Sequence, residues 1–410
     1  MVQSHTLLFF MFPQTARDLV TPKPQAFFHL IATINSFPKS PFFLALLSPS
    51  ILDRSPFIMS SSDPIELLPR ACGVCGKKDD LLRCSGCQVV YYCGQEHQAI
   101  DRKIHKSGCT KTRKARVNLD KEEQTLRDTP GDMFVPDNIF ENGVGHFWGI
   151  METRPYMRAR YQLVDTLLLS IGGAGGRVDA VQTALDHLLD MLRLCRSDNM
   201  GVRDLVPALF MRLGRDQEAY DFVKWYATAG DQTDYDWGDM ELPFLDVKDA
   251  DVFETPVEKW TGEGWLEMSH VVAVILIKIR ILSDLEGALN ATVAFEGSVA
   301  EEIIEVIRQQ TAGSIVRSRP EMLRASAEEM TRRVETIKAQ IKALYKSVDK
   351  YNPHFWRLML GDPYAAAAER PISYSPKSEE EAYLVIWYSL AAWLETYRSF
   401  DTMRSISETA

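Results

Sequence analysis

Cysteine and histidine are concentrated in one short stretch of this chain, between residues 72 and 109. Six of the seven cysteines and two of the eight histidines lie there. Thiolate sulfur and imidazole nitrogen are the ligands that zinc prefers in proteins, and a tetrahedral site needs four of them. The stretch therefore predicts a small module built around two zinc ions, with eight candidate ligands: Cys72, Cys75, Cys84, Cys87, Cys93, His97, His105 and Cys109.

The spacing of the cysteines favours metal binding over disulfide bonds. Two Cys-x-x-Cys pairs separated by eight residues are typical of a metal site in a chain of 410 residues. Because zinc thiolates persist where thiols are kept reduced, we expect a protein of the cytoplasm or nucleus. The seventh cysteine, Cys195, lies on the apolar face of a predicted helix, and we interpret it as a buried thiol.

The order and spacing of the eight ligands resemble those of the MYND-type zinc finger. Tyr92-Cys93, Gln98 and His105-Lys106 lie where that motif has them. The resemblance implies a cross-brace, in which alternate ligand pairs share an ion. His97 is a departure, since the family usually has cysteine there, but imidazole is as good a zinc ligand as thiolate. The implied ligand sets are Cys72, Cys75, Cys93 and His97 for one zinc, and Cys84, Cys87, His105 and Cys109 for the other.

Each implied site already has four protein ligands, whereas a catalytic zinc keeps an open position for water. We therefore expect both ions to be structural, and removal of one ligand to unfold the finger locally while the rest of the chain stays folded. The resemblance also implies recognition of a protein partner, typically through a short proline- and leucine-containing peptide. Ser85 and Gln98 are retained, but Arg102 replaces the tryptophan that usually helps to form the peptide groove. Arg102 is interpreted either as a contact for an acidic peptide or as a solvated side chain.

Two other classes of function compete with an interaction adaptor. Some MYND proteins are SET-type lysine methyltransferases, but this sequence lacks the Asn-His dipeptide of a SET active site. A transcriptional or nucleic-acid-associated regulator would use the basic residues between 102 and 116, although the net charge of −10 argues against a chain devoted to nucleic acid. We predict a protein that is not an enzyme and has protein partners, and we expect neither nucleic acid nor a membrane as a partner.

The sequence divides into segments that must position the finger. Residues 1–62 are rich in Phe, Pro, Leu and Ser, and we interpret them as a disordered tail, a leader, or an upstream extension with translation beginning at Met59. The finger is predicted at 70–112, with residues 95–116 mainly helical, and a linker at 113–145. A helical array at 146–230, an acidic loop at 231–263 and a second helical domain at 264–400 follow.

The predicted fold class is mainly α, with the zinc module followed by an array of paired helices of the tetratricopeptide type. Asp216 is expected to cap one helix, and residues 320–349 are expected to form one long charged helix. The apolar run 271–282, interrupted by Lys278 and Arg280, is interpreted as a buried core helix. The C-terminal aromatic residues are expected to seal this core: Phe355, Trp356, Trp387, Tyr388 and Trp393.

Overall fold

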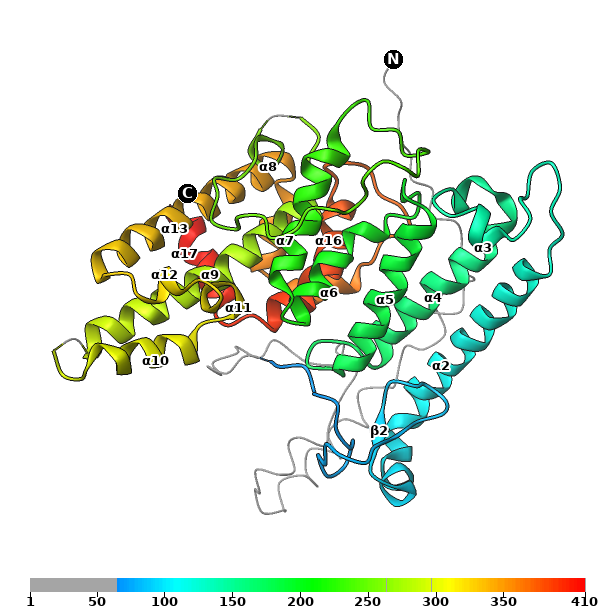
Figure 1. Ribbon diagram of the computed structural model, residues 1–410, viewed down its shortest axis with the longest axis horizontal. Coiled ribbons are helices and arrows are strands. Elements are labelled where there is room, and N and C mark those ends of the chain that lie inside the picture. The colour runs from blue at the N-terminus through cyan, green and yellow to red at the C-terminus, as the bar shows by residue number, and fades with distance from the viewer. Residues whose placement is uncertain (1–64, 263, 296, 410) are drawn as a thin grey trace, which may run out of the picture.

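The computed structural model describes residues 65–262, 264–295 and 297–409, and helices dominate this part of the chain (Figure 1). Two short strands, β1 (Leu82–Arg83) and β2 (Tyr91–Tyr92), pair antiparallel with Leu82 opposite Tyr92. The prediction of a mainly α protein with a small zinc module is confirmed. The interpretation of residues 1–62 lies outside the described residues.

The first group of helices packs in chain order. Helix α2 lies along α4, α4 along α5, α5 against α6, and α6 against α7 (Figure 1). The long helices of this group range from 12 to 33 residues, so no regular repeat length emerges. The group consists of α2 (Gln95–Arg127), α3 (Ile139–Asn142), α4 (Arg154–Ser170), α5 (Val178–Leu194), α6 (Val206–Arg212) and α7 (Asp216–Ala227), with the 3-10 helices η2 (Phe147–Gly149), η3 (Met151–Thr153), η4 (Val202–Asp204) and η5 (Ala229–Asp231).

The second group is built around α9, which contacts α7, α10, α13 and α16. The acidic loop precedes it and contains only one short helix, α8. The group consists of α8 (Glu258–Thr261), α9 (Met268–Phe295), α10 (Glu301–Thr311), α11 (Ser314–Arg317), α12 (Pro320–Leu323), α13 (Ala327–Tyr351), α14 (His354–Leu360), α15 (Pro363–Ala368), α16 (Glu379–Leu394) and α17 (Ser399–Thr409).

The run 271–282 of helix α9 is buried despite Lys278 and Arg280, as predicted. The Lys278 ammonium, which is fully buried, donates to the Val252 carbonyl at 3.0 Å and to Gln340 Oε1 at 2.7 Å. Burial lowers the pKa of Lys278 to about 8. The Arg280 guanidinium donates to Asp216 Oδ1 at 2.7 Å. Both cations therefore attach neighbouring segments to the core. In the described part of the chain, no helix combines the length and the apolar composition needed to cross a bilayer.

The prediction that Asp216 caps a helix is wrong. Arg215 is the residue before α7, and Asp216 is the first helical residue, with its carboxylate paired to Arg280. The Arg280 guanidinium therefore bonds the carboxylate that was expected to cap the helix.

The single helix expected over residues 320–349 is also divided. It forms α12 and α13, because the hydroxyl of Ser326 accepts the Glu329 N–H and begins a new helix.

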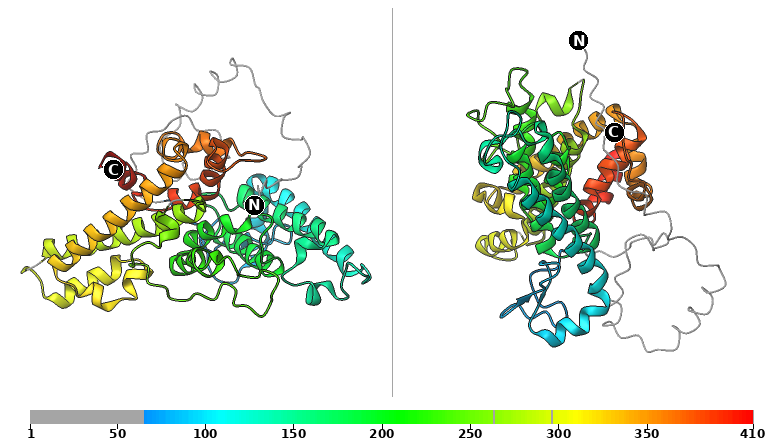
Figure 2. Two further views of the ribbon diagram at one scale, coloured as in Figure 1. Left: turned by 90° about the horizontal axis from the view of Figure 1, so that it is seen from above. Right: turned by 90° about the vertical axis from the view of Figure 1, so that its right-hand side faces the viewer.

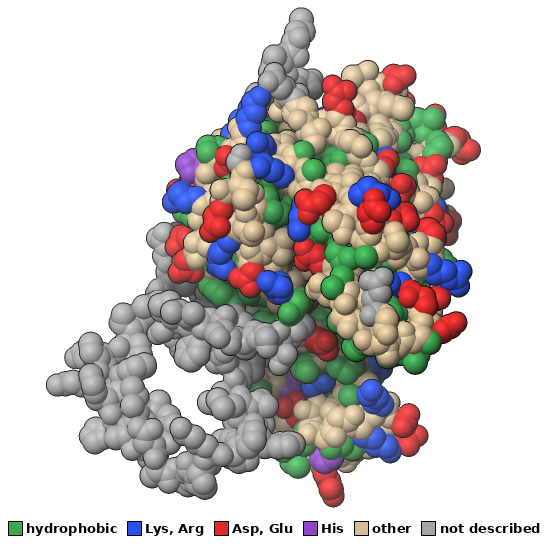
Figure 3. All heavy atoms as spheres, turned by 90° about the vertical axis from the view of Figure 1, so that its left-hand side faces the viewer, with side chains coloured by type: hydrophobic (Ala, Val, Ile, Leu, Met, Phe, Trp, Pro, Cys, Tyr) green, Lys and Arg blue, Asp and Glu red, His purple; other side chains and the backbone are tan. Residues whose placement is uncertain are grey.

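Helix α2 passes without a break through the boundary predicted between finger and linker at residue 112. It continues to Arg127 because Leu119 and Leu126 bury their side chains toward the helical body. Figure 2 shows the finger at the free end of α2, beyond the rest of the helices. On the face drawn in Figure 3, acidic and basic side chains are interspersed over the body. The C-terminal aromatic residues lie in the core as predicted, with Trp387 only partly buried: Phe355, Trp356, Tyr388 and Trp393 are the buried ones.

Candidate metal centre

Two turns of the same construction supply half of the candidate ligands. The Gly76 N–H donates to the Cys72 carbonyl, and the Gln88 N–H donates to the Cys84 carbonyl, each at 3.0 Å. Both donors have left-handed backbones, with φ of 72° at Gly76 and 62° at Gln88. Glycine adopts this conformation freely, whereas another residue loses on the order of 1 kcal/mol. Each turn places two thiols close together.

Helix α2 and the residue after β2 supply the other half. Cys93 follows β2 directly, and His97 lies in the first turn of α2. His105 and Cys109 lie one turn apart further along the same helix, where residues four apart share a face. His97 and His105 are about 12 Å apart along the axis, from eight residues at a rise of about 1.5 Å each. One helix therefore serves two separate sites.

The structure gathers the eight residues into the two groups that the resemblance implied. In each group the ligand atoms lie within 4.8 Å of one another. The Sγ–Sγ distance is 3.7 Å for Cys75–Cys93 and also for Cys84–Cys109. Two sulfurs at about 2.3 Å from one tetrahedral zinc would be about 3.8 Å apart. The geometry and the donor set fit two structural zinc ions. The groups are Cys72, Cys75, Cys93 and His97, and Cys84, Cys87, His105 and Cys109.

The two groups differ in their surroundings. Cys75 is exposed, and although burial opposes ionisation of Cys72, the N–H groups of Cys75 and Val74 lower its pKa to about 6. In the second group Cys87 is fully buried, and burial raises the pKa of its thiol to about 12. Desolvation likewise raises the pKa of Cys93 in the first group, to about 11. Zinc binds thiolate, so in both groups the charge of a bound ion would help to keep the ligands ionised.

A hydrogen bond outside the ligand set orients α2 against the strands. The buried Tyr92 donates its hydroxyl to Asp101 Oδ2 at 2.6 Å, and its ring meets His105 edge-on at 6.0 Å between centroids. Tyr92 precedes a ligand and Asp101 lies between the two ligating histidines, so this pair positions both sites. Sequence reasoning missed Asp101, although its place midway between His97 and His105 was a usable signal.

The finger is attached to the body by backbone and side-chain contacts that the sequence did not reveal. The Leu68 N–H donates to the Gly176 carbonyl at 2.8 Å, and the Val178 N–H donates back to the Leu68 carbonyl at 3.0 Å. Arg70 Nε donates to the carboxylate of Asp179, on the first turn of α5, at 2.8 Å. Residues 68–70 thus form a clamp between the finger and the body.

A buried ion pair holds the body side of this clamp. The glycine-rich residues 172–176 lie in the turn between α4 and α5. Arg212 Nη2 donates to the Gly173 carbonyl at 2.7 Å and to Glu395 Oε1 at 2.9 Å, and Glu395 Oε1 also accepts the Gly175 N–H at 2.9 Å. Arg212 and Glu395, which are far from this turn in the sequence, therefore hold the turn to which the finger is bonded.

The three residues predicted to contact a partner lie on the finger but do not bond to one another. Gln98 and Arg102 lie one turn apart on α2, and Ser85 lies in the loop between Cys84 and Cys87. Ser85 and Arg102 are exposed, and Gln98 is partly buried. Within the described part of the chain, no hydrogen bond joins their side chains. They remain predictions as partner contacts.

Comparison with known proteins supports the assignment of the eight zinc ligands to a MYND finger. The family model for the MYND finger matches residues 72–109. Residues 72–109 form a MYND finger. No solved structure matches the chain.

Similar curated proteins share this segment and little more. The chain is 36% identical over 82 residues to the Rho GTPase-activating protein gacZ of Dictyostelium discoideum, which is 19% of this chain and 8% of that protein. It is 48% identical over 46 residues to Egl nine homolog 1 of Homo sapiens, 11% of each chain. It is 35% identical over 74 residues to the histone-lysine N-methyltransferase ASHR1 of Arabidopsis thaliana, 18% of this chain and 14% of that protein. The chain thus spans only about a tenth of the length of these relatives.

Other polar groupings have their hydrogen bonds satisfied internally. His270 Nδ1 pairs with Glu267 at 2.9 Å, while the neighbouring Ser269 donates its hydroxyl to Asp204 at 2.5 Å. The hydroxyl and the imidazole therefore have different partners. His187 Nδ1 accepts from Arg160 Nε at 3.1 Å.

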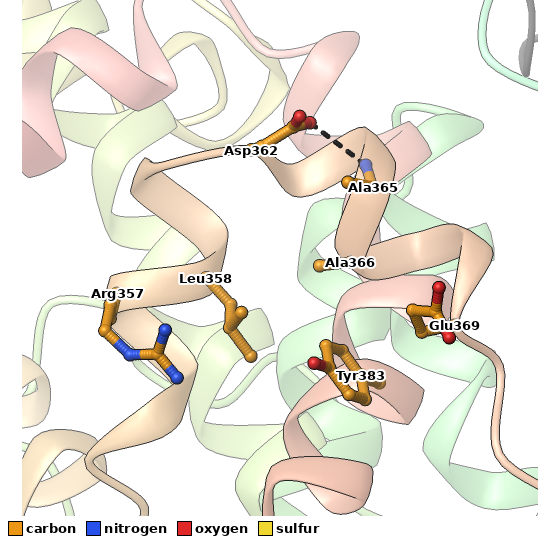
Figure 4. Close-up of a pocket in the computed structure, with 7 residues that line it drawn as sticks. All are labelled: Arg357, Leu358, Asp362, Ala365, Ala366, Glu369 and Tyr383. Carbon is orange, nitrogen blue, oxygen red and sulfur yellow. Dashed lines mark hydrogen bonds between the residues drawn. The ribbon is translucent and has the colours of Figure 1, made fainter.

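A hollow of about 310 Å³ lies among α14, α15 and α16 (Figure 4). Within it, Asp362 accepts the Ala365 N–H at 3.0 Å and caps α15, and Arg357 pairs with Glu379 at 2.6 Å. Two of its charged groups, Asp362 and Arg357, thus already serve the fold.

Proposed function

We propose that this protein is an interaction adaptor, in which the MYND finger recognises a segment of a partner protein and the helical body acts as the scaffold. The observation that carries the proposal is the pair of closed Cys3His groups on a finger clamped to the body. MYND fingers are protein-interaction modules. A finger with four ligands at each ion has a structural task, so its surface is what remains for function.

The fixed attachment of the finger favours this role. Loosely tethered modules lose affinity because their partner must order them on binding. Here the continuous helix α2 and the clamp at residues 68–70 hold the finger in one orientation before any partner arrives. A pre-ordered surface supports recognition of a short peptide, whose own ordering already costs free energy.

An enzymatic function is less well supported. The likeness to ASHR1 covers 14% of that protein and includes the finger, so it carries no catalytic residue to this chain. In the polar group around His270, the Ser269 hydroxyl donates to the Asp204 carboxylate and the imidazole pairs with Glu267, so serine and histidine do not form a nucleophile–imidazole pair. We therefore propose that the protein is not a methyltransferase and acts in the cytoplasm or nucleus, where its thiols stay reduced.

A peptide-display selection on the zinc-loaded full chain tests the proposal. Wild type, Cys84→Ala and the matched control Cys195→Ala, which removes a buried cysteine outside the finger, would be compared. We expect wild type and Cys195→Ala to select a common short motif that Cys84→Ala no longer selects. The same motifs selected by Cys84→Ala would refute recognition by the finger.

The selection also separates the two interpretations of Arg102. If Arg102 contacts the peptide, the selected motif contains an acidic residue whose enrichment is lost in Arg102→Ala. Arg102→Trp, which restores the aromatic residue usual in the family, should instead enrich proline and leucine. An Arg102→Ala variant that selects the wild-type motif unchanged would identify this side chain as solvated.

A further inference from the structure

Positive charge is concentrated in the middle of α2, between residues 102 and 116. Between residues 102 and 119 the chain has seven basic residues and no acidic one, although its overall net charge is −10. Arg116 has a structural contact, since its Nη2 donates to the Cys87 carbonyl at 3.2 Å. The others are exposed: Arg102, Lys103, Lys106, Lys111, Arg113 and Lys114.

Several other cations of the long helices are held in ion pairs. In the second half of α2, Arg127 pairs with Glu123, and on α13 Arg332 pairs with Glu328. Across the ranges that the structure describes, no acidic side chain pairs with Lys103, Lys106, Lys111 or Lys114. Like charges three or four residues apart on a helix destabilise it by about 0.2–0.5 kcal/mol per pair. The arrangement therefore opposes folding, and the fold alone does not explain it.

The unpaired lysines lie on one face. The opposite face of α2 buries Cys109, Thr112, Ala115 and Leu119 toward the body. From the first to the last lysine the helix rises about 16 Å, at about 1.5 Å per residue. We name this surface the lysine face; it lines a shallow hollow and consists of Lys103, Lys106, Ser107, Thr110, Lys111 and Lys114.

We propose that the lysine face binds an acidic segment of a partner protein, in extended conformation and at least about five residues long. An extended chain advances about 3.3 Å per residue, so five residues match the length of the face. Lysine ammonium groups attract carboxylates as point charges without requiring the bidentate geometry of arginine, and Ser107 and Thr110 supply hydroxyl donors beside them. A partner segment rich in Asp and Glu therefore has complementary charge along the whole face.

The charge of the rest of the chain favours a peptide over nucleic acid. The loop 231–263 exposes acidic side chains, with nine acidic residues between Asp231 and Glu254 against the single Lys248. Long polyanions would be repelled by these charges, whereas a short acidic peptide would meet only the lysine face. The inference goes beyond the proposed function because it concerns a different surface of α2 from Gln98 and Arg102, and it stands or falls independently of them.

Fluorescence anisotropy with a labelled Glu/Ser octapeptide tests the proposal on the zinc-loaded full chain. The variant Lys103→Gln/Lys106→Gln/Lys111→Gln/Lys114→Gln should bind at least about tenfold more weakly than wild type, because each neutralised ammonium removes attraction. Wild-type binding should weaken as salt rises from about 50 to 500 mM. The matched control neutralises four exposed cations elsewhere: Lys121→Gln, Arg332→Gln, Lys338→Gln and Arg404→Gln.

Equal zinc content and circular dichroism in all variants establish that the fold is retained. Selective weakening in the lysine-face variant supports the proposal. Absence of saturable binding to wild type, or equal weakening in the control, overturns it. Competition by an oligonucleotide duplex that binds more tightly than the peptide also overturns it, and would assign the surface to nucleic acid.

Discussion

The finger and the helical body of this protein are stabilised in different ways. The finger buries few large side chains, chiefly Val89, Val90 and Tyr92, and its loops are held by two groups of metal ligands. The body buries nearly all of the first half of α9 together with aromatic residues such as Trp225 and Trp393. A small module cannot remove enough apolar surface from water to fold alone, whereas the body can. Metal removal should therefore unfold the finger and leave the body folded.

Zinc removal is the change with the largest expected effect. Structural zinc contributes on the order of 10–16 kcal/mol to the folding of finger peptides. Chelation, or the substitution Cys84→Ala, should unfold the finger while the body keeps its thermal transition. Hydrogen exchange resolved along the chain would measure this, with fast exchange expected up to about residue 109 and continued protection in α9. Loss of protection in α9 as well would mean that the body depends on the metal.

Gly86→Ala tests the packing of the second site without removing a ligand. A Cβ at Gly86 would lie 2.7 Å from the Sγ of Cys109, closer than side chains approach, so the ligand must move. We expect zinc at this site to bind at least about tenfold more weakly, equivalent to about 1.4 kcal/mol. A chelator competition measures the affinity. Gly94→Ala is the control, because a Cβ there meets nothing within 4 Å; equal affinities for both variants would contradict the prediction.

Acid should weaken the body through His187. Burial and the neighbouring Arg160 lower the pKa of His187 to about 4, from its ordinary 6.5. Between these values the unfolded chain binds a proton that the folded chain does not, so stability falls as pH falls from 6.5 toward 4. At about 1.4 kcal/mol per pKa unit, the loss is at most about 3 kcal/mol.

Urea unfolding of the body across this pH range measures the loss. His187→Gln should make the free energy of unfolding less dependent on pH, since glutamine can still accept a hydrogen bond from Arg160 and does not titrate. The partly exposed His354 provides the control, as His354→Gln should leave the slope of stability against pH unchanged. A wild-type slope retained in His187→Gln would disprove the assignment.

Arg70→Ala loosens the clamp and has the smallest expected effect. The substitution leaves the buried Asp179 carboxylate without its cation, but Arg70 is 62% exposed, which limits the expected loss to about 1 kcal/mol. Hydrogen exchange at residues 68–70 should quicken while the chain still holds two zinc ions. Arg83→Ala, which changes an exposed residue of the finger, should alter neither the exchange at residues 68–70 nor the zinc content. Loss of zinc in Arg70→Ala would show that the clamp stabilises the sites themselves.

The sequence by itself determined the ligands and most of the helices. Metal ligation depends on residue type and short spacing, so the pattern from Cys72 to Cys109 was sufficient to identify the finger, and its resemblance to the MYND motif implied the pairing that the structure shows. The apolar run from Val271 to Leu282 likewise predicted a buried helix, because the composition of a short segment is a local property.

Only the tertiary structure decided how the finger and body are joined. The predicted linker begins inside α2 because Leu119 and Leu126 pack on the body, a contact that local sequence does not encode. Asp216 does not cap α7 as expected, because its carboxylate pairs with Arg280, 64 residues away in the sequence. The clamp from Arg70 to Asp179 spans 109 residues. Such long-range polar contacts depend on which helices become neighbours, and periodicity within one segment carries no information about that choice.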